Sequence, residues 1–284
     1  MTTSKRIICR TAIFVMATSW LQCLAAQPYV DPFQVRYLHA FRQGSGKATP
    51  FTHLWAGSDI PLRLREKTYL VLSPYFEQWN LDSAGVSGIL SPVKSLALPV
   101  GLIIPLTNSK WSLTFYPTVR TNGERLFGER TLQAGGASFA SWERRPGQKF
   151  RFGVYVNDEF FGLFVIPLLG TDWKIDEKNY VFGLLPGRLT WEHRHNRRMY
   201  YGATFRAITN SYRLDNGNFL RLDDNQLSVY ADVYLLKRLC LTVESGYGIL
   251  RKIRTGKYTR EYLADEKWGD GPFIRLSASY RVRI

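Results

Sequence analysis

In the segment 274–284 the sequence reads Ile-Arg-Leu-Ser-Ala-Ser-Tyr-Arg-Val-Arg-Ile, with an apolar residue at every even position and a polar one at every odd position. A β-strand points successive side chains to opposite faces, so this segment predicts a strand with one apolar and one polar face. Arg275, Arg281 and Arg283 all fall on the polar face. Such a strand belongs at a boundary between water and an apolar environment.

The same alternation recurs along most of the chain, for example where Leu227 and Val229 are interleaved with Gln226 and Ser228. No stretch after residue 26 has convincing helical periodicity. The segments at 179–185 and 188–195 could also be one kinked strand, so we expect an all-β fold of 12–14 strands. The fourteen candidate strands are 33–42, 51–63, 68–80, 94–106, 110–121, 131–143, 149–158, 163–175, 179–185, 188–195, 199–213, 225–236, 239–253 and 271–284.

The connections between these strands come in two sizes. Short turns, such as 107–110 and 145–148, alternate with longer polar or glycine-containing loops near 43–50, 81–93, 122–130, 214–224 and 254–270. Antiparallel transmembrane barrels have short periplasmic turns and longer outer loops. A soluble β-sandwich would explain the alternation but not the two loop sizes. The pattern therefore favours an outer-membrane β-barrel.

Four tryptophans support the barrel over the sandwich. Trp111, Trp142, Trp173 and Trp191 each lie beside a short turn, on the apolar face of their strand. Aromatic side chains gather at the headgroup level of a membrane, where they form girdles around barrels. We predict that these four residues form the periplasmic aromatic girdle and face lipid.

The first residues predict export. Lys5, Arg6 and Arg10 precede an apolar stretch, and the small residues Ala25 and Ala26 follow it. This is the layout of a secretory signal peptide, so we expect a signal peptide over 1–26 and one barrel domain over 27–284. In that domain Cys240 is the only cysteine, so no internal disulfide is expected.

Three short stretches resemble a known family. They are Asp-Pro-Phe-Gln-Val-Arg-Tyr at 31–37, Pro-Leu-Leu-Gly-Thr-Asp-Trp at 167–173, and Leu-Leu-Pro at 184–186 ahead of Leu189 and Trp191. They are similar to an uncharacterised outer-membrane β-barrel family, a domain of unknown function common in Bacteroidetes. The resemblance implies a barrel over the whole mature chain. It implies no activity and no functional residues.

The polar faces carry more basic than acidic residues, in keeping with the net charge of +15. Arg36, Arg275, Arg281 and Arg283 should lie close together, because the first and last predicted strands must pair to close a barrel. We predict a lumenal basic patch at these four positions, hydrated and answered in part by Glu244. Two interpretations remain open: a pore that favours anions, and an interior network of ion pairs that fills a narrow barrel.

Enzymatic and metal chemistry have weak support. His39 and His53 flank one outer loop and could approach each other, while His193 and His195 lie beside a periplasmic turn. No nucleophile is tied to them, and no third metal ligand accompanies the second pair. A calcium site among loop acids such as Asp215, Asp223 and Asp224 is less favoured than a solvated loop. We predict no catalytic, cofactor-binding or metal site.

The leading functional prediction is an outer-membrane protein without enzymatic activity, in the manner of a small-solute or anion-preferring channel. The alternatives are a barrel enzyme acting on lipid or envelope material, and a non-conducting structural or surface-binding barrel. Expected partners are outer-membrane lipid, the barrel-assembly machinery and a small solute. Nucleic acid is not expected, because the basic residues alternate into a lumen instead of gathering on a surface.

Overall fold

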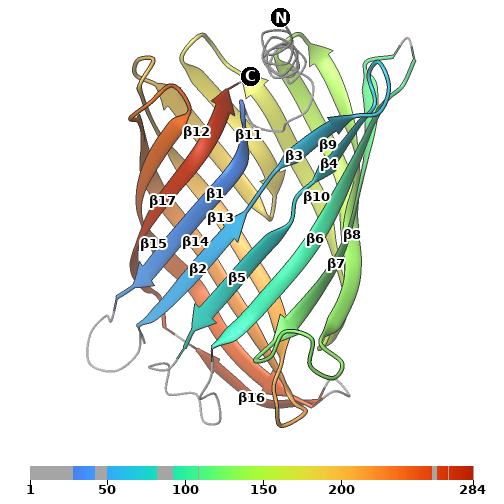
Figure 1. Ribbon diagram of the computed structural model, residues 1–284, viewed down its shortest axis with the longest axis vertical. Helices are drawn as coiled ribbons and strands as arrows, with labels where there is room; N and C mark the ends of the chain where they lie inside the picture. Colours follow the sequence, from blue (N-terminus) through green and yellow to red (C-terminus); the bar gives the residue numbers. More distant parts are fainter. Residues whose placement is uncertain are drawn as a thin grey trace, which may run out of the picture.

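The computed structural model describes residues 28–41, 50–81, 92–107, 109–257, 261–267 and 269–283, which form one β-barrel (Figure 1). Residues 1–26, the expected signal peptide, lie outside the described part of the chain. No helix among the described residues is long and apolar enough to cross a membrane. The strand segments are β1 (Tyr29–Ala40), β2 (Phe51–Gly57), β3 (Ile60–Arg63), β4 (Tyr69–Leu72), β5 (Tyr75–Asn80), β6 (Val93–Pro105), β7 (Trp111–Gly123), β8 (Leu132–Arg145), β9 (Gln148–Glu159), β10 (Gly162–Lys174), β11 (Asn179–Leu185), β12 (Arg188–Arg194), β13 (Met199–Arg213), β14 (Phe219–Tyr234), β15 (Leu239–Gly256), β16 (Tyr262–Lys267) and β17 (Gly271–Arg283).

These segments make a closed ring of 14 strands. β2 and β3 follow one another along the same strand of the ring, as do β4 and β5, because short breaks at 58–59 and 73–74 interrupt the ladder. β16 and β17 likewise share one position beside β15. β17 pairs antiparallel with β1 and closes the ring. The predicted fold class is therefore confirmed, with the strand number at the upper end of the expected range.

The barrel is apolar outside and polar inside. On β17, Leu276 is about half exposed whereas Arg275 is buried, and the same contrast runs along the strand. Exposed apolar side chains in such number are unfavourable in water and match the lipid-facing band of a membrane barrel. The chain is therefore an outer-membrane β-barrel. Outward apolar residues on β14 and β15 include Leu227, Val229, Val233, Leu241 and Val243.

The start of β1 and the end of β17 lie at the upper rim in Figure 1, together with short turns. Two of these turns are fixed by a side chain that accepts backbone hydrogen bonds. Asp176 accepts the N–H groups of Lys178 and Asn179 at 2.7 Å each, and Asn196 does the same in the next turn. The Asn179 side chain and these N–H groups hold the pKa of Asp176 below its usual value. By its short turns this rim is the periplasmic one.

The opposite rim carries the longer connections, although much of 43–50 and 81–93 lies outside the described residues. Two connections on that side are tight: 160–161 between β9 and β10, and 186–187 between β11 and β12. β11 and β12 have only seven residues each, whereas β10 has 13 and β13 has 15. The yellow hairpin of β11 and β12 therefore turns back well inside the length of the barrel (Figure 1).

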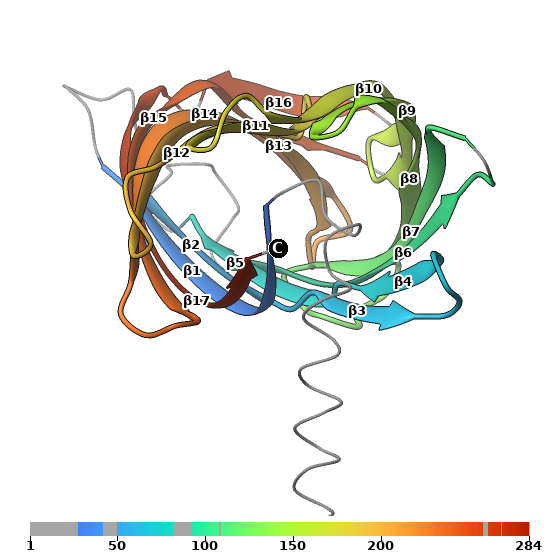
Figure 2. The same ribbon diagram turned by 90° about the horizontal axis from the view of Figure 1, so that it is seen from above.

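An apolar core closes the barrel near its outer rim. The outer part of β13 leaves the wall and crosses the interior, where Arg213 pairs with Gly123 of β7 (Figure 2). The inward side chains of the β13–β14 hairpin then pack against the inner faces of strands across the lumen. We call this cluster the outer plug; its members are Leu38, Ala40, Phe51, Trp79, Leu81, Val93, Tyr212, Leu214, Leu220, Leu222, Ile253 and Phe273.

The start of β14 differs from the sequence prediction, which placed 214–224 in a loop. The strand begins at Phe219, and there Leu220 and Leu222 point inward while Arg221 and Asp223 point outward. Further along, the apolar residues of β14 point outward and the polar ones point inward, so the polarity of the two faces is exchanged near Asn225. The reversal occurs because the outer part of the strand faces water outside and the plug inside.

The four tryptophans of the expected girdle lie beside periplasmic turns. Trp111 and Trp142 are register partners on β7 and β8, with ring centroids 6.1 Å apart. Trp173 and Trp191 both pair with Val181 of β11, one from each side. Each is partly or well exposed on the outer face. A lipid-facing girdle at these positions stays a prediction.

Candidate functional site: an arginine-lined lumen

Three of the four predicted patch arginines face carboxylates. Arg275 donates to Glu244 at 2.6 Å. Arg281 donates to both oxygens of Asp31, at 2.7 and 3.0 Å, and to Asp232 at 2.5 Å. These charges lie on the inner face and are nearly inaccessible to solvent. The patch is thus less hydrated than the sequence suggested, because acids from neighbouring strands reach it.

Arg283 completes this set near the periplasmic rim. Its guanidinium donates to Glu192 at 2.7 and 3.1 Å and to the Tyr234 hydroxyl at 2.8 Å. The Tyr200 ring lies 3.3 Å from its central carbon. Hydrogen bonds and ring contacts of this kind offset part of the cost of removing a guanidinium from water.

Arg36, the fourth member of the patch, has a different environment. It donates to the neutral side chain of Gln34 at 2.9 and 2.5 Å and lies 4.0 Å from the centre of the Trp55 ring. Among the described residues no carboxylate lies within ion-pair distance of it. Arg36 is also only partly buried, so its positive charge is available to an anion in the lumen.

Further ion pairs cross the inner face, as the network interpretation of the charges expects. Arg206 shares Glu244 with Arg275, at 3.3 Å. Arg151 faces Asp172 at 3.4 Å, and Arg251 faces Asp224 at 2.8 Å. Arg120 pairs with Glu159. These contacts narrow the lumen without filling it.

Arg251 and Asp224 were not among the lumenal residues expected from the sequence. A bulge at Leu250, whose φ is +54°, shifts the phase of β15 so that Arg251 and Ile253 point inward. Asp224 lies in the part of β14 that resembles a loop in sequence. The sequence feature that could have indicated this change of phase is the break in alternation at Ile249-Leu250.

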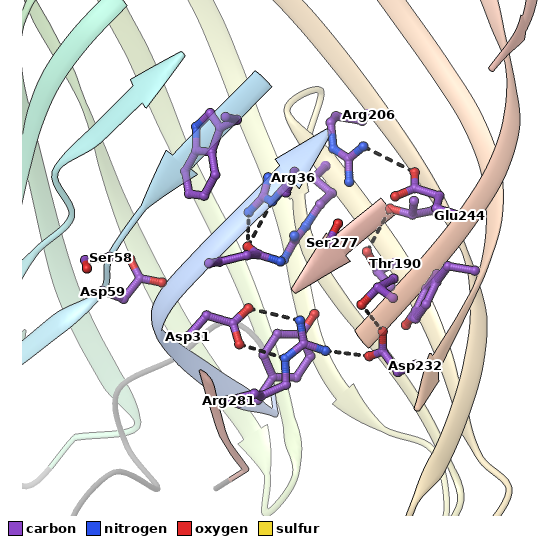
Figure 3. Close-up of a pocket in the computed structure, with 17 residues that line it drawn as sticks. Asp31, Arg36, Ser58, Asp59, Thr190, Arg206, Asp232, Glu244, Ser277 and Arg281 are labelled. Carbon is purple, nitrogen blue, oxygen red and sulfur yellow. Dashed lines mark hydrogen bonds and ion pairs between the residues drawn. The ribbon is translucent and has the colours of Figure 1, made fainter. Parts of the chain in front are cut away.

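Three cavities follow one another along the lumen. The inner cavity, of about 780 Å³, lies beneath the outer plug. It shares Arg36, Trp55, Arg188 and Arg206 with a middle cavity of about 70 Å³, shown in Figure 3. The middle cavity shares Arg281 with a recess of about 700 Å³ at the periplasmic rim. Arginines are therefore among the residues that neighbouring cavities share.

The middle cavity shows how the charges are arranged. In Figure 3 Arg281 lies between Asp31 and Asp232, and Arg206 points toward Glu244. The Arg36 guanidinium lies on the other side of the same space, where it bonds with Gln34. The carboxylates of Asp31, Asp59, Asp232 and Glu244 line the same cavity as these arginines.

The inner cavity has two chemically different sides. Its lumenal side carries Arg36, Arg206 and Arg275 together with His53 and Glu77. Its opposite side is apolar and includes Phe164, Ile166, Leu168, Leu184, Pro186 and Ile208. A volume of about 780 Å³ is within the usual range of roughly 300–1,000 Å³ for small-molecule pockets. The inner cavity can therefore hold a molecule that is both charged and apolar.

The histidines do not form the pair that the sequence left open. Leu38 and His53 are register partners that point inward, so His39 points outward and cannot meet His53. His53 instead contacts Glu77 at 3.2 Å and stacks on Trp79. Among the described hydrogen bonds none joins His53 to a serine or threonine hydroxyl.

His193 lies on the outer face, where it contacts Asn179 at 2.9 Å, and His195 lies exposed in the adjoining turn. The acids considered for calcium each face an arginine, for example Asp215 with Arg125 at 2.9 Å. In the described part of the chain no group of three or more histidine, cysteine or acidic side chains could hold a metal ion.

Comparisons with known proteins give similarity in shape and little in sequence. No protein-family model and no curated protein matches the chain. The family resemblance noted in the sequence therefore stays a prediction. Three solved structures illustrate the likeness in shape, each with very low sequence identity.

A channel of the outer membrane of Pseudomonas putida F1 is 9% identical, with 92% of this chain and 98% of that chain covered and a TM-score of 0.48. The NanC porin is 11% identical, over 87% and 98% of the two chains, with a TM-score of 0.41. The toluene transporter TodX of Pseudomonas putida is 10% identical, over 93% and 92%, with a TM-score of 0.37. All three are proteins of the barrel type to which this chain belongs by its own topology.

Proposed function

We propose that this barrel is a narrow, selective outer-membrane channel for small anionic solutes. The observation that carries the proposal is the Arg36 guanidinium, which borders both the middle and the inner cavity and has no described carboxylate within ion-pair distance. Arg188 and Arg206 border the same two cavities. Rings of basic side chains favour anions in pores, and guanidinium groups bind carboxylates and phosphates strongly.

The outer plug sets the expected size of the conductance. Its side chains close the direct path from the outer rim, so we expect a much smaller conductance than an open porin would give. Electrostatic selectivity should nevertheless persist, because a solute in the inner cavity meets the guanidinium of Arg36, which has no described carboxylate within ion-pair distance.

The test is the reversal potential of purified protein in a planar bilayer under a salt gradient. We expect the sign that reports anion preference. Arg36→Gln should weaken this preference, because it removes a positive charge from the narrowest part of the path. Arg65→Gln is the matched control, since it removes the same charge from an exposed periplasmic turn. Cation preference in the wild-type protein would refute the proposal.

The outer plug favours a second candidate, a non-conducting structural barrel. Apolar side chains packed across the lumen and ion pairs beneath them are what such a protein requires. The same bilayer measurement separates the two candidates. A complete absence of conductance, with the barrel shown to be folded, would favour the structural barrel.

A further inference from the structure

The wall of the barrel is incomplete on one side. β10 pairs with β11 only from Leu169 onward, so its first part, Gly162–Leu168, has a registered neighbour only in β9. β13 pairs with β12 only as far as Arg206, and beyond that point it runs beside β14 alone until Arg213 reaches β7. No described strand occupies the interval. We name this opening, between 162–168 of β10 and 208–212 of β13, the window.

The short hairpin of β11 and β12 is the cause. A transmembrane β-strand needs about 9–11 residues to cross the hydrocarbon layer. β11 starts and β12 ends at the periplasmic rim, and each has only seven residues, so their tip at 186–187 lies within the membrane. The window opens beyond this tip, toward the outer leaflet. Leu163 and Val165, on the adjoining part of β10, are more than half exposed on the outer face.

The window has a closed outer edge. The backbone N–H of Phe160 donates to the Ser211 hydroxyl at 3.0 Å, which ties the β9–β10 turn to β13. The Arg221 guanidinium lies 4.2 Å from the centre of the Phe161 ring. The window is therefore a bounded aperture and not a split that runs to the rim of the barrel.

The backbone of β10 suits an unpaired edge. Lys174 donates its N–H to Gly147 on the β9 side, and Ile175 donates to Asn179 on the β11 side. Because this direction alternates along an antiparallel strand, the backbone groups of Pro167 point toward the window. Proline has no N–H to leave unsatisfied there. An unpaired edge at membrane depth is tolerated where it borders a water-filled cavity.

The inner cavity lies directly behind the window. Its side next to the membrane is apolar, and its lumenal side is charged. Phe164, Ile166 and Leu168 are apolar although they point inward, where β9 presents Arg151, Tyr155 and Asn157. Together with Pro186 they form an apolar lining next to the membrane. The arginines lie on the far, lumenal side of the same space. A molecule that fits this arrangement has an apolar tail toward lipid and an anionic head toward the lumen.

From this arrangement we infer that the window admits a single-chain anionic amphiphile, of the fatty-acid type, from the outer leaflet into the inner cavity. The inference deepens the proposed function and rests on the same basic lumen. At about 30 Å³ per non-hydrogen atom, the inner cavity has room for on the order of 25 such atoms. One acyl chain with a small head fits this volume, whereas a two-chain phospholipid does not.

The first test uses photoactivatable palmitate in liposomes that contain the full-length protein. We expect label on the inward side chains Phe164, Ile166 and Leu168 of β10 and on Ile208, as located by mass spectrometry. Leu227 and Val229 report the background from bulk lipid, because they face it on β14. Label confined to such lipid-facing positions would overturn the inference, and this readout needs no variant to fold.

The second test closes the window. Ile208→Trp adds bulk to its inner edge and should lower palmitate capture about tenfold, the effect of losing roughly 1.4 kcal/mol of binding. Val229→Trp, an equally large change on the lipid-facing side of β14, is the matched control. Folding of both variants is verified by heat-modifiable migration on gels. Equal capture by the folded Ile208→Trp variant and the wild type would contradict the inference.

The third test concerns the head group. Arg36→Gln should lower capture of the palmitate probe about tenfold or more, as expected for loss of a charge-assisted hydrogen bond, with Arg65→Gln as control. Capture of a matched long-chain alcohol probe should be unaffected. Equal losses for both probes would show that charge plays no part.

The two proposals fail in different measurements. Anion-selective conductance of water-soluble salt without palmitate capture would leave the proposed function intact and overturn the window inference. Palmitate capture without any anion selectivity would support the window and overturn the proposed channel for small anions.

Discussion

Arg281 joins strands that are far apart in the sequence. Its guanidinium, 4% exposed, contacts Asp31 of β1 and Asp232 of β14, and it lies 3.7 Å from the centre of the Tyr29 ring. Removing one member of a buried ion pair leaves the other charge uncompensated, which is costly. The stability of the barrel should therefore depend strongly on this one residue.

We predict that Arg281→Gln lowers the free energy of unfolding by about 3 kcal/mol, since Asp31 and Asp232 would keep buried charges without a cation. Urea unfolding in lipid vesicles, followed by tryptophan fluorescence, measures the change. Arg65→Gln should stay within about 0.5 kcal/mol of the wild type, because Arg65 is exposed. Similar losses in the two variants would contradict the role given to Arg281.

The sequence placed Arg281 on the polar face of its strand, but the acidic residues that pair with Arg281 could not be predicted from it. Alternation assigns a face to each side chain, and in the structure Arg275 and Arg281 are buried on the inner face. Which acids come within reach depends on strand register and barrel closure. Asp31 precedes the first predicted strand, so its contact with Arg281 depends on an extension of β1 that alternation did not indicate.

The β13–β14 hairpin is the element that closes the outer mouth. Tyr212 is fully buried in the outer plug, and its hydroxyl donates to Glu77 at 2.8 Å. Asn210, on the same strand, donates to the same carboxylate at 3.0 Å. Glu77 of β5 therefore holds the hairpin from across the lumen.

We predict that Tyr212→Ala increases conductance in planar bilayers several-fold and destabilises the barrel by about 3 kcal/mol. The variant removes a large buried ring and one of the hydrogen bonds that hold the hairpin. Tyr201→Ala is the control, because Tyr201 lies on the outer face of the same strand. A destabilised barrel with unchanged conductance would show that the outer plug does not limit flow.

The inner and outer faces of a strand could be assigned from the sequence where they meet water and lipid, whereas they could not where the strand has other neighbours. The outer part of β14 alternates in the opposite sense, so it resembles a loop in sequence. β10 is apolar on both faces along 163–168, because one face meets lipid and the other lines the inner cavity. A strand that is apolar on both faces shows no alternation. The window beside β10 therefore could not be predicted from the alternation pattern.

The depth of the barrel in the membrane should be set by its tryptophans. If Trp111, Trp142, Trp173 and Trp191 form the periplasmic girdle, nitroxide lipids labelled at the headgroup should quench their fluorescence better than lipids labelled deep in the chain. Replacing each in turn with phenylalanine should remove part of the headgroup quenching. Trp79→Phe should not, because Trp79 is fully buried in the outer plug. Stronger quenching by the deep label would place the band elsewhere.

The seam between β1 and β17 bears on the way the barrel assembles. Until β17 has paired with both β1 and β15, Asp31 and Asp232 lack the guanidinium of Arg281, and Glu244 has only one of its two arginine partners, Arg206. A partly closed ring thus carries uncompensated carboxylates at membrane depth. A state in which the seam is only partly paired is therefore unfavourable. Closure should accordingly be an all-or-none step. It should also be slow to reverse, because separating the two strands exposes all of these charges at once.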